Sequence, residues 1–293
     1  MTLIQEIANL LSCETDTIVT IFITVAIFIS GILVNLCNTR IRKSIDRRNY
    51  RNFVQELITN IRIYTKKQSK EFEKFHKTLR IDNHQPFVIK RKSESSLSTF
   101  NKIPIEKIYD SFLGGIFCNN KKRRKGLRFI LNNTLLIENI DSELPQDIDK
   151  MLSKFSQYEN SWDKSIDEIR KIYDSLRQQY ISQSLNPNYL PLFKDMNEIL
   201  SEWKISENAT NRTYVKEKII DVLPHKIIQK YNGLDLVILF QNSTIEAKLA
   251  YDNMENTISI YANMFSDYQR IFNNYDRKMK IATRIISVRN FCR

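Results

Sequence analysis

The stretch that decides the fold is residues 17–39, TIVTIFITVAIFISGILVNLCNT, which contains no charged residue. Its 23 residues are bounded by Asp16 and Arg40. A helix rises about 1.5 Å per residue, so a segment of this length crosses a hydrocarbon core of roughly 30 Å. No other uncharged run in the sequence approaches this length. We therefore predict a single transmembrane helix over residues 17–39.

The charges on the two sides of this segment predict its orientation. Glu6, Glu14 and Asp16 precede it without any Lys or Arg, whereas residues 40–51 contain six Lys or Arg. The positive-inside bias places such a basic flank in the cytoplasm and the N-terminus outside. A cleavable signal peptide would need a basic N-terminal region and a shorter apolar run, and the sequence has neither. We expect an uncleaved anchor, preceded by a short amphipathic segment over residues 1–16.

One side of the predicted span carries polar and small residues. At about 100° per residue, six of them fall within roughly 60° of arc; these are Thr17, Thr20, Thr24, Gly31, Asn35 and Asn38. Ile27 and Phe28 occupy the gap in the middle of this stripe. The stripe is either a helix–helix packing surface or the lining of a pore that Ile27 and Phe28 close midway. Both interpretations require self-association, because the sequence contains no second span.

The remaining sequence predicts an all-α protein. Only five glycines and six prolines occur in 293 residues. Residues 40–81 predict a stalk helix that continues from the span, with an apolar stripe at steps of three and four: Tyr50, Phe53, Leu57, Ile61, Tyr64, Gln68, Phe72, Phe75 and Leu79. Residues 82–103 contain Pro86 and a Ser-rich run and predict a linker or loop. A cytoplasmic helical domain follows over residues 104–293, with a possible break near 186–191.

Several helices are expected inside this domain. Separate helices are predicted over residues 127–140 and 147–155. From Trp162 to Tyr180, apolar residues recur in heptads, which suits either a coiled coil between chains or a core helix of one chain. The apolar run 236–240 (LVILF) is compatible with a buried strand, but we favour a helix because helix-compatible polar residues follow it.

Basic residues are concentrated near the span. The whole chain has a net charge of +12, yet residues 40–130 alone contain 24 Lys or Arg against 8 Asp or Glu, which is +16. Anionic headgroups account for the cations nearest the bilayer, and a polyanionic ligand is the alternative for those farther away. The candidate polyanion-binding residues are Lys66, Lys67, Lys70, Lys74, Lys90, Arg91, Lys92, Lys121, Lys122, Arg123, Arg124 and Lys125. The last five form the densest run, which we expect on a loop between helices.

No motif in the sequence predicts catalysis. The five glycines are too scattered for a phosphate-binding loop of the G-x-x-x-x-G-K-[ST] or G-x-G-x-x-G type. There is also no G-x-S-x-G nucleophile elbow. The three histidines share no metal-ligand spacing with Cys, Asp or Glu. We therefore expect no enzyme, no catalytic residue, no metal site and no cofactor.

This layout of one polar-striped span followed by a basic helical region resembles small bacterial membrane effectors of anti-phage defence. The resemblance is one of architecture alone, and it transfers no ligand-binding residue. It implies a bacterial inner-membrane location and a homo-oligomeric pore, gated by a nucleotide or single-stranded nucleic acid that a separately encoded protein supplies. The alternative from a different class is a non-conducting tether or adaptor that holds a helical scaffold at the membrane for a protein partner.

Overall fold

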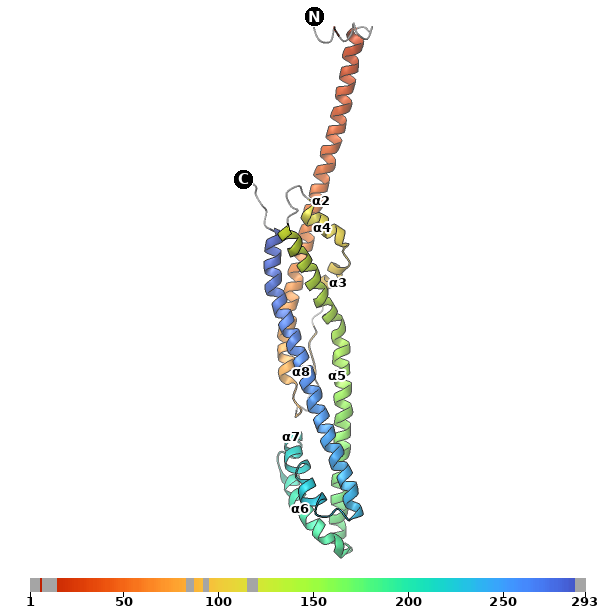
Figure 1. The fold of residues 1–293 in the computed structure, drawn as a ribbon, viewed down its shortest axis with the longest axis vertical. Coiled ribbons are helices and arrows are strands. Elements are labelled where there is room, and N and C mark those ends of the chain that lie inside the picture. The colour runs from red at the N-terminus through yellow and green to blue at the C-terminus, as the bar shows by residue number, and fades with distance from the viewer. Residues whose placement is uncertain (1–5, 7–14, 83–86, 92–94, 115–120, 288–293) are drawn as a thin grey trace. The chain divides into compact units, whose positions relative to one another are not determined.

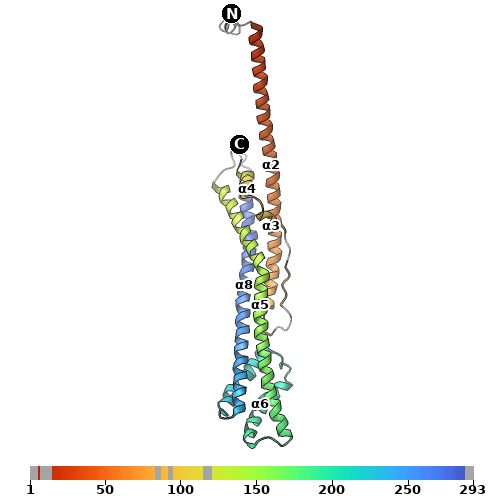
Figure 2. The ribbon, with the colours of Figure 1, turned by 90° about the vertical axis from the view of Figure 1, so that its right-hand side faces the viewer.

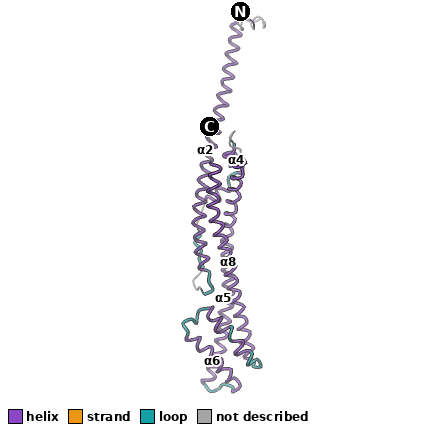
Figure 3. Tube along the Cα trace, turned by 60° about the vertical axis from the view of Figure 1, so that its left-hand side comes forward, coloured by secondary structure: helices purple, strands orange, loops and turns teal. Residues whose placement is uncertain are grey.

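The computed structural model describes residues 6, 15–82, 87–91, 95–114 and 121–287. Helices make up nearly all of this part of the chain, and no strand occurs in it (Figure 3). The predicted all-α fold, with an N-terminal apolar helix that continues into a helical domain, is therefore confirmed. The segment expected to be amphipathic, residues 1–16, lies almost entirely outside the described residues.

The long helices are α2 (Thr15–Thr78), α5 (Lys121–Ile181) and α8 (Asp235–Ser287). The shorter elements are α3 (Ser95–Asn101), α4 (Ile105–Leu113), η1 (Pro187–Tyr189), α6 (Leu190–Ile205), α7 (Arg212–Val215), η2 (Lys216–Ile220) and η3 (Pro224–Ile228). The chain divides into two compact units. Unit 1 comprises the described parts of Met1–Ile61, Ser95–Asn132 and Lys280–Arg293, and unit 2 those of Arg62–Glu94 and Asn133–Met279.

The first part of α2 is long and apolar enough to cross a membrane, by length and composition. Its side chains from residue 19 to residue 45 are all exposed, so nothing in the described chain covers this segment. An isolated apolar helix of this kind is stable only where lipid or another protein surrounds it. The helix then continues without a break through residues 40–78, as the stalk prediction requires.

In unit 2, α2, α5 and α8 lie side by side and share one core (Figures 1 and 2). Phe72 of α2 contacts the rings of Phe265 and Phe272 of α8, with ring centroids 6.1 and 5.1 Å apart. Thr134 of α5 and Tyr275 of α8 share a buried hydrogen bond of 2.9 Å. The predicted stripe on α2 is thus largely buried within its own chain, although Phe53 near its start is 42% exposed.

The heptad seam is also buried within the chain. Its residues from Trp162 to Leu176 are buried, whereas Tyr180 is 48% exposed. Trp162 packs on Tyr251 of α8, and Tyr173 stacks on Phe193 of α6. The seam therefore belongs to a core helix of one chain and not to a coiled coil between chains.

Three local expectations were wrong. Residues 127–140 and 147–155 are not separate helices, because α5 runs through both with Pro145 inside it. A proline interrupts the helical hydrogen bonds, but here Leu144 and Met151 are buried on either side of it and hold the two halves in one core. The run Lys121–Lys125 is the first part of α5 and not a loop. The expected linker 82–103 includes the helix α3, whose Leu97 and Phe100 are buried.

The aromatic core of unit 2 predicts the effect of a truncation. Phe72→Ala removes a fully buried ring that contacts three aromatic neighbours, so we expect a loss of about 3–5 kcal/mol in the free energy of unfolding. Urea unfolding in detergent measures this loss. The matched control is Phe53→Ala on the same helix, which should lose less than about 1 kcal/mol because its ring is exposed. Equal losses for the two variants would contradict this packing.

Candidate anion-binding site

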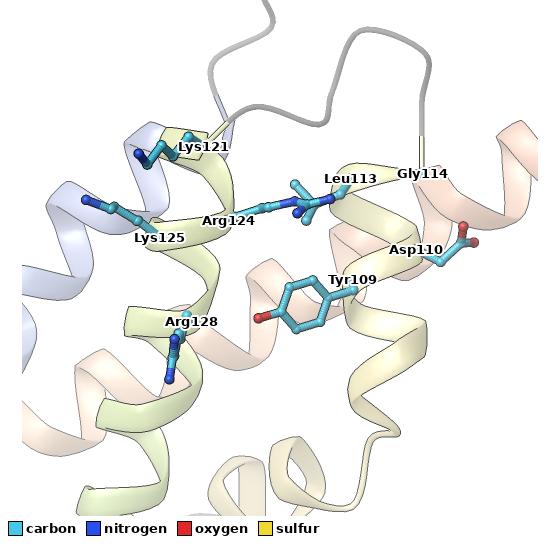
Figure 4. Close-up of a pocket in the computed structure, with 8 residues that line it drawn as sticks. All are labelled: Tyr109, Asp110, Leu113, Gly114, Lys121, Arg124, Lys125 and Arg128. Carbon is cyan, nitrogen blue, oxygen red and sulfur yellow. The ribbon is translucent and has the colours of Figure 1, made fainter.

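Unit 1 contains an open pocket of about 620 Å³ between α4 and the start of α5 (Figure 4). Four of its lining residues are cations from α5: Lys121, Arg124, Lys125 and Arg128. The other four come from α4 and the residue that follows it: Tyr109, Asp110, Leu113 and Gly114. The cations occupy positions i, i+3, i+4 and i+7 of one helix, which places them on a single face. The wall that α5 contributes is therefore uniformly positive.

The start of α5 gives these cations an unusual electrostatic setting. The first turn of α5 contains no acid, although the exposed N–H groups and partial positive charge of a helix N-terminus favour anions. Cations in the first turn oppose this dipole, each by roughly 0.3–1 kcal/mol at an exposed position. An anion bound in the pocket would neutralise both the side chains and the helix end.

The single acid of the pocket already has a partner. Asp110 accepts two hydrogen bonds from Arg47 of α2, at 3.0 Å from Nε and 2.8 Å from Nη2. Arg51 donates from Nε and Nη2 to the carbonyl oxygen of Ser111, at 3.2 and 3.0 Å, and so holds the same turn of α4. The hydrogen bond from Arg47 lowers the pKa of the Asp110 carboxyl.

Gly114 makes this arrangement sterically possible. A Cβ atom at this position would lie 2.4 Å from the Asp110 carbonyl oxygen and 2.8 Å from Nε of Arg47. Even an alanine would therefore displace the ion pair or the end of α4. Figure 4 shows Asp110 pointing away from α5, while the hydroxyl of Tyr109 points toward α5 and Arg124 extends toward Leu113. The side of the pocket that faces between the helices thus presents cations and a phenol hydroxyl.

Two other hollows have balanced charges and do not favour an anion. The groove of about 610 Å³ between α2 and α4 is lined by three acids and three bases, together with Tyr50 and Ser111. In unit 2, a pocket of about 370 Å³ is lined by Asp163 and Asp167 together with Arg170 and Arg212. Burial raises the pKa of Asp163 in that pocket. The excess of cations over acids among its lining residues therefore distinguishes the pocket between α4 and α5.

The structure brings together three of the predicted polyanion-binding residues, namely Lys121, Arg124 and Lys125. Lys122 is exposed without lining the pocket, and Arg123 is buried at 7% exposure. Sequence reasoning missed Arg128 and Tyr109. Arg128 could have been predicted if residues 121–128 had been assigned to a helix, because it follows Arg124 and Lys125 at helical spacing.

The other predicted cations belong to unit 2 and do not line this pocket. Lys66, Lys67, Lys70 and Lys74 are exposed on α2. The ammonium group of Lys74 lies 3.3 Å from Glu71. Arg91 donates to the backbone carbonyl and the carboxylate of Asp141, at 3.0 and 3.1 Å, whereas Lys90 is exposed. Lys92 lies outside the described residues.

The polar stripe of the predicted span is partly satisfied by its own helix. The hydroxyl of Thr20 donates to the Asp16 carbonyl and that of Thr24 to the Thr20 carbonyl, both at 2.8 Å. Within the described chain, the side-chain amides of Asn35 and Asn38 have no such partner. Thr17, Ile27, Phe28 and Gly31 lie exposed on the same helix. The amides are therefore the groups that most need a partner within lipid.

Among the described residues, no three His, Cys, Asp or Glu side chains gather where they could hold a metal ion. Lysine and arginine side chains, helix N–H groups and a phenol hydroxyl are instead hydrogen-bond donors for oxyanions. The pocket is consequently suited to binding phosphate groups.

The ion pair beside the pocket predicts a pH dependence. Because Asp110 has a lowered pKa in the folded chain, its stabilising effect is present above its unfolded pKa of about 3.9 and is lost as the pH falls. Asp110→Asn should therefore lower the free energy of unfolding by about 0.2–1 kcal/mol at neutral pH, because this pair is partly exposed. Below about pH 4 the difference from wild type should shrink.

Urea unfolding of the two proteins at neutral and acidic pH tests this expectation. Asp46→Asn is the control, since it removes the same charge one residue before Arg47 but leaves the pair intact. A difference that persists unchanged at acidic pH would contradict the assignment.

Comparison with known proteins adds no family to this description. No protein-family model matches the chain, and comparisons with curated proteins and with solved structures gave no match. The function must therefore be inferred from the chemistry of the site and of the apolar helix.

Proposed function

We propose that this protein is a self-associating, membrane-anchored effector that binds a phosphate-bearing anion in the pocket between α4 and α5. The observation that carries the proposal is the charge of that pocket. Four cations line it, and its one acid is paired with Arg47. In this proposal the apolar part of α2 lies in a bacterial inner membrane, with the N-terminus outside and the remainder in the cytoplasm.

The shared chemistry of the ligand is its phosphate group. The planar guanidinium groups of Arg124 and Arg128 suit two-point hydrogen bonding to phosphate oxygens, whereas Lys121 and Lys125 act as point charges. Nucleotides, single-stranded nucleic acid and phospholipid headgroups all present this group. The affinity for a soluble polyanion should fall steeply as the salt concentration rises.

The contacts of α4 suggest how such a ligand would act on the span. One side of α4 lines the pocket, and its Asp110 holds Arg47, which follows the apolar segment by eight residues on the same helix. A ligand that shifts α4 would therefore act on α2 through this pair. It could gate an oligomeric pore only if it bound the open and closed assemblies with different affinity.

A second candidate is the non-conducting tether. The observation that favours it is that the hydroxyls of Thr20 and Thr24 bond to their own helix. These side chains need neither pore water nor a neighbouring helix as a partner. In this version the stripe serves packing alone.

Charge reversal tests the anion pocket. The double variant Arg124→Glu/Arg128→Glu should weaken the binding of a fluorescent oligothymidylate by at least about tenfold, since it replaces attraction by repulsion. Fluorescence anisotropy in detergent, repeated over a salt series, measures this loss. The control Lys150→Glu/Lys154→Glu makes the same charge change on exposed residues of α5 that do not line the pocket and are not among the predicted polyanion-binding residues. Equal weakening by both variants would refute the pocket assignment.

Self-association through the span has a separate test. Asn35→Leu/Asn38→Leu should weaken oligomerisation in micelles by roughly tenfold, because each interhelical amide contact contributes about 0.6–2 kcal/mol. Sedimentation equilibrium measures the association constant. Cys37→Leu is the matched control, since it replaces an exposed polar residue away from the stripe. An unchanged constant in the asparagine variant would rule out association through this face.

A further inference from the structure

The pocket of unit 1 lies close to the point where α2 leaves its apolar segment. Arg47 follows Thr39 by eight residues, which is about 12 Å along a helix axis. The guanidinium of Arg47 holds Asp110 at 2.8 Å, and Asp110 lines the pocket together with the adjacent Tyr109. The pocket is therefore at the height of the first turns that emerge from the predicted bilayer.

Two exposed apolar residues indicate that the headgroup layer extends along α2 toward the pocket. Ile41 and Ile45 follow the apolar segment at helical spacing and are 56% and 52% exposed, although basic residues surround them. Apolar side chains between cations suit the layer where headgroups meet acyl chains. That layer is about 5–8 Å thick on each side of the hydrocarbon core. Since Arg47 is about 12 Å beyond Thr39, it lies roughly 4–7 Å beyond this layer.

The helix ends that line the pocket also lie on the side of unit 1 nearest the apolar segment. In Figures 1 and 2, the end of α4 and the start of α5 lie at the end of unit 1 from which the apolar part of α2 extends. Long Lys and Arg side chains extend several ångströms from their helix, which widens the range over which their charges act. The Debye length of about 8 Å at physiological salt is comparable with the distance from the headgroup layer to Arg47. Headgroup phosphates are thus within electrostatic range of the start of α5, where the pocket's cations begin with Lys121.

On this basis we infer that the phosphate in the pocket belongs to an anionic phospholipid of the leaflet that α2 leaves at Arg40. The inference rests on the proposed anion pocket and names its ligand. An anionic leaflet repels soluble polyanions, so that the local concentration of a doubly charged anion falls roughly tenfold at the surface. The same leaflet holds its own phosphates permanently beside the pocket. A lipid headgroup therefore has an advantage over a nucleotide at this site.

Lipid binding would also stabilise the start of α5. The headgroup phosphate would offset the four cations and accept hydrogen bonds from backbone N–H groups of the first turn. Amide hydrogens in residues 122–128 should therefore exchange more slowly when the pocket is occupied. This readout does not depend on any activity of the protein.

The experiment places the full chain in nanodiscs of phosphatidylcholine alone, or of phosphatidylcholine with about a third phosphatidylglycerol. Hydrogen exchange followed by mass spectrometry should show severalfold slower exchange over residues 122–128 in the anionic discs. Arg124→Gln/Arg128→Gln should remove this difference, whereas Lys150→Gln/Lys154→Gln, at exposed residues outside the pocket, should retain it. Circular dichroism of each variant verifies that its helix content is unchanged.

A third arm adds oligothymidylate to the neutral discs and separates this inference from the proposed function. Protection by the anionic lipid, with or without protection by oligothymidylate, supports the inference. Protection by oligothymidylate alone overturns it but leaves the anion pocket in place. Protection by neither probe refutes both the lipid inference and the anion pocket.

Discussion

The continuity of α2 is the constraint on which the rest of the structure depends. One unbroken helix contains the apolar segment, the arginines that hold α4 and the aromatic residues of the core of unit 2. Each residue advances by about 1.5 Å, so the distance from the end of the apolar segment to Arg47 is fixed by the helix itself. A displacement of α4 and a displacement of the apolar segment therefore involve the same helix.

The basic residues at the start of α5 matter because the helix dipole disfavours cations at a helix N-terminus. Acids are the residues that stabilise a helix N-terminus, yet α5 begins with Lys121 and contains no acid in its first turn. The nearby Asp110 does not compensate, because it is held by Arg47 and points away from α5 (Figure 4). An external anion bound in the pocket would offset this positive charge. The proposed phosphate ligand follows from this local imbalance rather than from the total charge.

Apolar surface is distributed very unevenly between the chain and its surroundings. The apolar stripe of residues 50–79 on α2 and the heptad seam are both largely buried in the intramolecular core, as the burial of Phe72 and Tyr173 shows. The apolar segment of α2 has no such cover. Hydrophobic burial therefore leaves this apolar segment as the principal exposed apolar surface of the described chain, available to lipid or to another copy of the chain. This difference explains why association is proposed through the span and not through the bundle.

The sequence by itself determined the all-α class, the apolar helix and the stripe that buries Phe72, because these depend on local periodicity and length. It did not predict that α5 continues through Pro145, since buried neighbours outweigh a local helix breaker. Nor could it separate Arg124 from Arg123, because only the docking of α4 decides which face of α5 lines a pocket. The ion pair between Arg47 and Asp110 joins residues 63 positions apart, and only tertiary packing brings such distant residues together.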